Sequence, residues 1–455
     1  MTEDDEEVRE IIPTPLGAAN VYLLSYAFNQ DHSCFVCGTT AGFRVYTTSP
    51  VAEVHRREQI GTFENRSVVL VSMLFKTNIF AMVTKAEDDH SGLNKVQIYD
   101  DRKRKMLNEL RSRNEVKGVC LRRDIIVMVC EYAIYVYTCD KLQVILHLTT
   151  NANTQGLCVV ASSSEPWILC CPGQSTGAVR VQHGQDTNAT HVFTAHQTAL
   201  AALAINASGT LVATASETGT VVKVFQCSNG QELYRLRRSA RPAVITCLVF
   251  RLDDRFLGVA SSSSTVHIFK LDLATASTEG EGVGSPSLGP SEEPHLSEAV
   301  ENRSNPTFER IASGIQKAVT RAVTAESVSD VVKGVMPRYF KDLRSFATFR
   351  IPDADVEATV DARSHQASIL GPQVAFHKDQ PKFFVLHYSG LLYECSFRPD
   401  GDPSLGTQEC GFDCATTWFA VRPDFKVQGP STKVPTVSGG AVDNDEEAEE
   451  WQLIG

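Results

Sequence analysis

The chain has 455 residues, of which 42% are hydrophobic and 21% charged, and its formal net charge at pH 7 is -11. This length admits one large repeat architecture or two to three ordinary domains, and the acidic balance excludes the broad basic field that nucleic-acid binding requires. No run approaches the roughly 18 apolar residues of a membrane span, so we expect a soluble protein whose membrane contacts are peripheral.

Residues 1–19 form an acidic segment that begins MTEDDEEVRE. It lacks the basic and then apolar stretches of a secretory signal, which favours a cytoplasmic location. The 13 cysteines are an odd number scattered through strand-like runs, as is typical of a reducing compartment. Cys34 and Cys37 are three positions apart, which puts them on opposite faces of a strand. We therefore expect buried thiols there and no metal site.

The same strand ending recurs along the chain as FRVY, VQIY, IYVY, VRVQ, VKVF, VHIF and LYEC. The seven copies occupy residues 43–46, 96–99, 134–137, 179–182, 222–225, 266–269 and 392–395. Their endings are 53, 38, 45, 43, 44 and 126 residues apart, and all but the last interval are close to the ~40–45 residues of a four-stranded propeller blade. We predict an all-β fold, a seven-bladed β-propeller over residues 20–425. The alternative, a pair of β-sandwiches or a barrel, gives no reason for a steady period.

The segment YRLRRSARP, residues 234–242, sets Arg237 and Arg238 side by side at the end of a strand-like run. Neighbours in a strand point to opposite faces, so the two side chains should reach two separate pockets. Hydroxylic residues and a histidine lie near each arginine in the expected blade order: His196, Ser216, Thr218 and Thr220 in the preceding unit, and Ser262, Ser264, Thr265 and His267 in the following one. Guanidinium groups flanked by hydroxyls and imidazole suit phosphate. The alternative is a solvated strand edge.

The long last interval predicts an insertion in the sixth blade, residues 272–342. Its first half, residues 272–306, is rich in Gly, Ser, Pro and Glu, which is typical of disorder. The second half contains an apolar stripe at helical spacing, formed by Phe308, Ile311, Ile315, Val319 and Val323. Arg310, Lys317 and Arg321 cluster on the opposite side. A basic amphipathic helix of this kind inserts into an anionic membrane surface; alternatively it packs on the propeller or a partner.

No catalytic pattern stands out in the chain. There is no Walker loop, HExxH or grouped carboxylate motif. We therefore expect no enzymatic activity and no cofactor.

Residues 195–271, which contain the arginine pair, resemble the core of the PROPPIN family, the WD-type propellers that bind phosphoinositides and include the WIPI autophagy proteins. Similarity extends to FNQDHSCFVCGTTAGFRVY, LCCPGQSTGAVRV and MPRYFKDLRSFATFRIPD, and covers residues 20–425. No WD dipeptide occurs in the chain. The family motif Phe-Arg-Arg-Gly stands here as Leu236-Arg237-Arg238-Ser239. Glycine at the last position can adopt a backbone geometry that serine resists, so the resemblance leaves open a shift of Arg238.

The resemblance implies a non-enzymatic effector that reads phosphatidylinositol 3-phosphate or 3,5-bisphosphate on autophagic, endosomal or vacuolar membranes. Arg237 would serve one pocket with the residues of the preceding unit, and Arg238 the other with those of the following unit. An autophagy lipid-transfer protein is an expected partner. The alternative is a protein-interaction scaffold without specific lipid binding.

Residues 426–455 form an acidic tail that we expect to be disordered, with six acids between residues 443 and 450. Trp451 and, three positions on, Ile454 resemble the motif by which autophagy proteins add a strand to ubiquitin-like modifiers. An extended tail can pair with a sheet edge while these two side chains fill pockets. The alternative is an inert acidic tail.

Overall fold

The structure is a computed structural model, and it describes residues 21–58, 67–85, 92–186, 189–272, 342–352, 371–401 and 406–419. The chain divides into two compact units, Met1–Leu271 with Arg344–Gly455, and Asp272–Leu343. Every blade and pocket described below lies in the first unit. The predicted amphipathic helix and the C-terminal motif lie outside the described residues.

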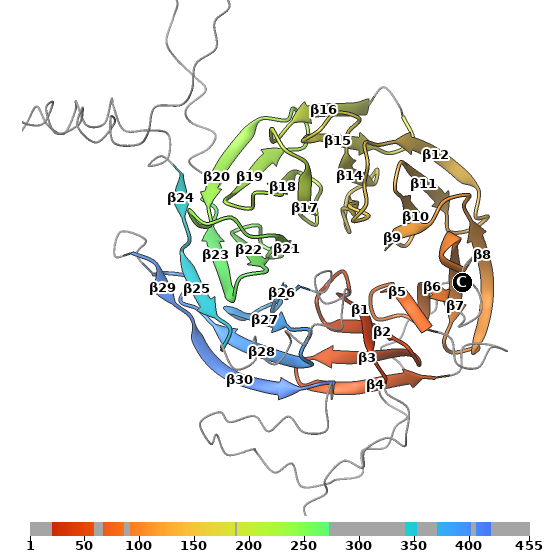
Figure 1. Cartoon of the computed structure of the whole chain (residues 1–455), viewed down its shortest axis with the longest axis horizontal. Helices are drawn as coiled ribbons and strands as arrows, with labels where there is room; N and C mark the ends of the chain where they lie inside the picture. Colours follow the sequence, from red (N-terminus) through yellow and green to blue (C-terminus); the bar gives the residue numbers. More distant parts are fainter. Residues whose placement is uncertain are drawn as a thin grey trace, which may run out of the picture. The chain divides into compact units, whose positions relative to one another are not determined.

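The strands of the first unit form seven four-stranded blades arranged in a ring, with the first strand of each blade near the centre (Figure 1). Blades one to four consist of β1 (Leu23–Phe28), β2 (Cys34–Thr39), β3 (Gly42–Thr48) and β4 (Val51–Arg57); β5 (Ser67–Met73), β6 (Ile79–Lys85), β7 (Lys95–Asp100) and β8 (Lys105–Arg111); β9 (Val116–Leu121), β10 (Ile125–Cys130), β11 (Ala133–Thr138) and β12 (Val144–Thr149); and β13 (Val159–Val160), β14 (Ile168–Pro172), β15 (Ala178–His183) and β16 (Thr190–Thr194).

Blades five to seven consist of β17 (Leu200–Ile205), β18 (Leu211–Ser216), β19 (Val221–Gln226) and β20 (Glu232–Arg237); β21 (Ile245–Phe250), β22 (Phe256–Ser261), β23 (Thr265–Lys270) and β25 (Ala347–Arg350); and β26 (Gln373–Phe376), β27 (Lys382–Leu386), β28 (Leu391–Ser396) and β30 (Gly411–Thr417). Two short strands, β24 (Leu343–Arg344) and β29 (Gln408–Glu409), and one 3₁₀ helix, Gly92–Asn94, complete the described elements. The prediction of a seven-bladed propeller is confirmed, and each of the seven recurring endings lies in the third strand of a blade.

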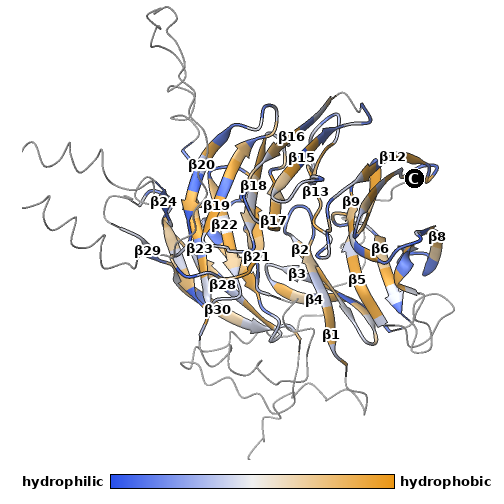
Figure 2. Ribbon diagram, turned by 45° about the horizontal axis from the view of Figure 1, so that its top comes forward, coloured by the Kyte–Doolittle hydropathy of each residue, from blue (hydrophilic) through white to orange (hydrophobic). Residues whose placement is uncertain are grey.

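The core consists of clusters between neighbouring blades. Second strands such as β18 and β22 are buried along their whole length because blades cover both of their faces. At the seam between blades five and six, Val222 and Leu236 pack against Leu257 and Val259. Figure 2 shows that apolar residues concentrate in the strands, whereas many connecting turns are polar. Cys34 and Cys37 are fully buried and belong to two different clusters, as their spacing predicted.

The ring closes between blades seven and one by side-chain packing. Trp418 lies against the rings of Tyr26, Phe35 and Tyr46 at centroid distances of 6.3, 5.1 and 5.4 Å. The Tyr26 hydroxyl donates to the carbonyl of Gly371 at 2.6 Å, and the Gln373 amide donates to the carbonyl of Tyr26 at 3.0 Å. All four strands of each of these two blades come from one continuous part of the chain. The closure therefore depends on side-chain packing and these two hydrogen bonds and not on an exchanged strand.

The sixth blade contains the predicted insertion. Its third strand, β23, ends at Lys270 and its fourth, β25, begins at Ala347. The segment between β28 and β30 of blade seven leaves its own blade and adds β29 to the edge of β25, in parallel. No helix in the part of the chain that the structure describes combines the length and the apolar character needed to cross a membrane.

Candidate anion-binding site

The arginine pair lies where the fourth strand of blade five ends. Arg237, the last residue of β20, pairs with Val221 of β19, and Lys223 pairs with Arg235. This register puts Arg237 on the same face as Lys223, whose amine donates to the carbonyl of Ala195 on the side of blade four. Leu236 faces the other way, into the core shared with blade six. Alternation along the strand thus separates the two arginines.

Arg238 is buried at the seam between blades five and six, with 7% of its surface exposed. Its Nε donates to the carbonyl of Gly219 at 2.7 Å, and its Nη1 donates to Ser263 Oγ at 3.3 Å. Its Nη2 donates to the carbonyl of Arg241 at 2.5 Å. Burial lowers the pKa of the Arg238 guanidinium from its ordinary value. These three hydrogen bonds of the guanidinium to described residues all go to neutral oxygens.

Gly219 brings a backbone carbonyl to Arg238. Its φ is +57°, and a Cβ there would collide with the carbonyl oxygen of Ala243. Only glycine allows this turn to approach the loop after β20 so closely. The carbonyl of Gly219 is thereby directed to Arg238 Nε.

Ser239 stands without strain where the resemblance expects glycine. It is not among the described residues with positive φ, and its Oγ accepts a hydrogen bond from the N–H of Arg241 at 3.1 Å. Since the carbonyl of Arg241 accepts from Arg238, the serine turn supports the arginine. Serine at this position therefore does not require a backbone geometry that it resists.

His267 lies beside Arg238 on β23, and 8% of its surface is exposed. Burial, and then the positive charge of Arg238, lower the pKa of His267 to about 4. The imidazole is therefore neutral at pH 7. Its Nδ1 lies 3.2 Å from Ser345 Oγ, just before β25.

The serines at the seam have different partners. Ser263 contacts Arg238, and its Oγ is 2.7 Å from that of Ser261. Ser262 is exposed, and its Oγ accepts from the N–H of Val244 at 3.2 Å. Ser264 and Thr265 are half-buried; the carbonyl of Ser264 accepts from the N–H of Ile351 at 2.7 Å. Among four consecutive serines, sequence reasoning had no basis to choose Ser263.

The residues predicted around Arg237 contact one another, Thr214 or the backbone of Arg238. His196 Nε2 lies 2.9 Å from Thr214 Oγ1, and Ser216 Oγ lies 2.9 Å from Thr218 Oγ1. The carbonyl of Thr220 accepts from the backbone N–H of Arg238 at 3.0 Å. Burial, and then the charge of Lys223, lower the pKa of His196 to about 4.

Lys223 is a further cation on this face, and sequence reasoning missed it. It forms an ion pair with Glu232 at 3.0 Å and holds the carbonyl of Ala195 next to His196. Lys223 occupies the second position of VKVF, as His267 does in VHIF. That shared position was the signal that could have found it.

Blade one also contains two adjacent arginines, at the end of β4, but these are matched by carboxylates. Arg56 Nε lies 2.7 Å from Glu53 Oε1. Arg57 donates to both carboxylate oxygens of Asp101 in blade two, at 2.5 and 2.8 Å. Arg57 and Arg238, the second members of the two pairs, therefore differ in electrostatics although they occupy similar positions in their blades.

The described residues contain no group of three or more metal-ligating side chains. The chemistry of the two arginine environments suits anions instead. Guanidinium, hydroxyl and neutral imidazole groups can all donate to phosphate oxygens. The two environments are separated by the sheet of blade five.

A family model named PROPPIN matches residues 22–288. Autophagy-related protein 18 of Aspergillus terreus is 27% identical over 405 residues, which cover 80% of this chain and 94% of the relative. The protein of the same name from Mycosarcoma maydis is 29% identical over 403 residues, with 78% and 87% covered.

Two solved structures share the fold. Hsv2 of Kluyveromyces lactis superposes with a TM-score of 0.60 at 18% identity, over 87% of this chain and 99% of that one. KlAtg21, solved in complex with the coiled coil of AgAtg16, superposes with a TM-score of 0.61 at 19% identity, over 88% and 100%.

Proposed function

The chain belongs to the PROPPIN family, and from this premise we propose that it is a non-enzymatic effector of 3-phosphorylated phosphoinositides. Its ligands are phosphatidylinositol 3-phosphate, phosphatidylinositol 3,5-bisphosphate, or both. It acts at the surface of preautophagosomal, endosomal or vacuolar membranes, in autophagosome formation or membrane traffic. The relatives named Autophagy-related protein 18 support this assignment.

The observation that carries the proposal is the contrast between Arg238 and Arg57. A buried cation is stable when an anion or a full set of acceptors surrounds it. Arg57 has the carboxylate of Asp101, whereas the hydrogen-bond acceptors of Arg238 among the described residues are two carbonyls and one hydroxyl. A phosphate group supplies the missing negative charge at the seam.

We assign the two pockets as the sequence suggested and add Ser263 to the second. His196, Ser216, Thr218 and Thr220 act with Arg237, and Ser262, Ser264, Thr265 and His267 act with Arg238. Two weak headgroup contacts on one molecule act at high effective concentration, so their avidity exceeds either affinity. Insertion of the apolar face from Phe308 to Val323 adds to the membrane affinity.

The proposal extends to protein partners. Trp451 and Ile454 in the acidic tail would pair with the sheet edge of a ubiquitin-like modifier of autophagy. An autophagy lipid-transfer protein would bind elsewhere on the propeller. Exchange of both tail residues for alanine should abolish capture of the modifier and leave lipid binding unchanged.

One observation favours the alternative, a scaffold without specific lipid binding. The Arg238 guanidinium already makes three hydrogen bonds that join the loop after β20 to blade six. In a scaffold, the role of Arg238 would be only to form these three bonds. The two candidate functions predict opposite results in one experiment.

The experiment is flotation of the purified protein with vesicles that contain phosphatidylinositol 3-phosphate, the 3,5-bisphosphate, or phosphatidylserine alone. We expect flotation only with the 3-phosphorylated lipids, and its loss in R237A/R238A. The matched control is R102A/R104A, which removes the same charge from exposed positions in blade two. Equal flotation of both double variants, or none of the unmodified protein, would replace the effector by the scaffold.

A further inference from the structure

The described part of the segment between β28 and β30, residues 397–401 and 406–410, which we call the blade-seven excursion, is bound to blade six next to the second pocket. The backbone N–H of Gln408 donates to the carbonyl of Phe346 at 3.0 Å, and that of Cys410 donates to the carbonyl of Thr348 at 2.9 Å. Thr348 pairs across the sheet with His267. Only one strand therefore separates the excursion from this histidine.

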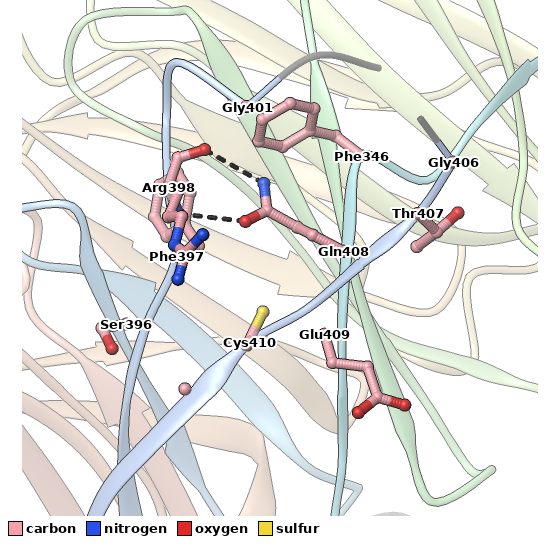
Figure 3. A pocket seen from close by; sticks show the side chains of 11 residues that line it. Phe346, Ser396, Phe397, Arg398, Gly401, Gly406, Thr407, Gln408, Glu409 and Cys410 are labelled. Carbon is pink, nitrogen blue, oxygen red and sulfur yellow. Dashed lines mark hydrogen bonds between the residues drawn. The ribbon is translucent and has the colours of Figure 1, made fainter. Parts of the chain in front are cut away.

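The excursion is closed on itself by the side chain of Gln408. Its Oε1 accepts from the N–H of Arg398 at 3.1 Å, and its Nε2 donates to the carbonyl of the same residue at 3.0 Å. Figure 3 shows this pair of bonds beside Phe346 and Thr407, at a cavity of about 580 Å³. One amide thus satisfies both backbone groups of Arg398, as a neighbouring strand would.

Thr407 connects the excursion to the residue that contacts His267. Its Oγ1 donates to the backbone carbonyl of Ser345 at 2.8 Å. On the other side, the N–H of Phe346 donates to the carbonyl of Ile268 at 2.8 Å. The peptide group between Ser345 and Phe346 is therefore held from two sides, by Thr407 and by Ile268. The Ser345 hydroxyl lies 3.2 Å from His267 Nδ1.

We propose that Ser345 and Thr407 are positioning residues of the second anion pocket: Thr407 fixes Ser345, and Ser345 holds the His267 ring and favours its Nε2–H tautomer. A neutral imidazole has one donor and one acceptor nitrogen, so the role taken at Nδ1 decides the role left to Nε2. The contact allows the Ser345 hydroxyl either to donate to Nδ1 or to accept from it; we assign it the donor role, which leaves His267 Nε2–H as a donor for a phosphate oxygen. The inference rests on the proposed lipid-binding function and assigns part of the site to blade seven.

The test isolates the second pocket in an R237A background and uses soluble inositol 1,3-bisphosphate as the probe. Calorimetry should show affinity about fivefold lower after Thr407→Val, the loss expected for one hydrogen bond. Gln408→Ala, which opens the excursion, should act in the same direction. In an R238A background, Thr407→Val should change nothing, because the second pocket is already disabled.

The matched control is Thr47→Val. Thr47 Oγ1 donates to the carbonyl of Pro50 at 2.6 Å in blade one, so this variant removes a similar bond far from the pocket. It should leave the affinity unchanged. Thermal unfolding of both variants shows whether either has lost its fold.

The second readout is the ¹⁵N spectrum of the His267 ring. The unmodified protein should show the Nε2–H tautomer, and Ser345→Ala should produce a mixture. Unchanged affinity together with an unchanged tautomer in Ser345→Ala and Thr407→Val would overturn the inference, while binding of the probe by R237A would still support the function. Absence of probe binding by the unmodified protein would instead refute the proposed function itself.

Discussion

Arg57 and Arg238 each stand second in an arginine pair at the end of a fourth strand, yet their environments require different partners. Asp101 neutralises Arg57 through two hydrogen bonds across the seam between blades one and two. At Arg238, the described partners are neutral. A double arginine in the sequence is therefore not sufficient to indicate an anion site. Whether the second arginine needs an external anion depends on the presence of an acid on the neighbouring blade.

Removal of the acid should expose this difference as a loss of stability. Asp101→Asn leaves Arg57 largely buried without its counter-charge, and we expect the free energy of unfolding to fall by about 3 kcal/mol. Ser263→Ala, which removes a neutral acceptor from Arg238, should cost about 1 kcal/mol. Urea denaturation of both variants measures the two values. A larger loss for Ser263→Ala would contradict the assignment of charge.

Three histidines with lowered pKa values should make the stability depend on pH. Burial is the largest cause that lowers the pKa of His196, His267 and His387 to about 4, whereas an unfolded histidine titrates near 6.5. Between these values the unfolded chain binds more protons, so stability is fully present above about pH 6.5 and is lost as the pH falls toward 4.

Replacement of one of these histidines should reduce the loss. Between pH 7.5 and 5.0, the unfolding free energy of His267→Gln should fall by up to about 2 kcal/mol less than that of the unmodified protein. Urea denaturation at the two pH values tests this. The same loss in both proteins would mean that His267 is not buried as a neutral group.

At the scale of elements, the third strands were predictable and the added strands were not. The third strand of each blade recurs because it lies between two others and has apolar residues facing both adjoining blades. In contrast, β29 is two polar residues, Gln408 and Glu409, paired in parallel with a strand about 60 residues earlier in the chain. Only tertiary contact forms it, so no local pattern could indicate it.

The site shows the same limit. Alternation in a strand predicted that Arg237 and Arg238 would separate, and the register of β20 agrees. Ser345 and Thr407, however, reach the second pocket through the fourth strand of blade six and the excursion of blade seven. The separation of these residues in the sequence does not indicate that they contact one another or His267.

The turn before β19 should be sensitive to one methyl group. Gly219 and Gly406 both have positive φ, but only at Gly219 would a Cβ meet a neighbouring backbone atom. We expect Gly406→Ala to cost about 1 kcal/mol through the backbone alone, and Gly219→Ala to cost more. Gly219→Ala should also weaken lipid binding, because the Gly219 carbonyl holds Arg238. Vesicle flotation and thermal unfolding of the two variants check both effects; equal behaviour would contradict the account.

For the molecule as a whole, the seam between blades seven and one should open most easily, because the two blades share no strand and are joined by ring packing and the hydrogen bonds between Tyr26 and Gly371 and Gln373. Trp418, with 6% of its surface exposed, contacts three aromatic rings of blade one. Trp418→Ala should lower the unfolding free energy by about 3–5 kcal/mol. Hydrogen exchange should then accelerate first in β1 and β26. Uniform acceleration around the ring would argue against a weak seam.

We have proposed that blade five separates two anion pockets, one for each arginine. Calorimetric titration with soluble inositol 1,3-bisphosphate tests it most directly, because it counts sites without a membrane. We expect two sites in the unmodified protein, one in R237A, one in R238A and none in the double variant. A single site that both single substitutions abolish, or two sites that survive the double substitution, would contradict it.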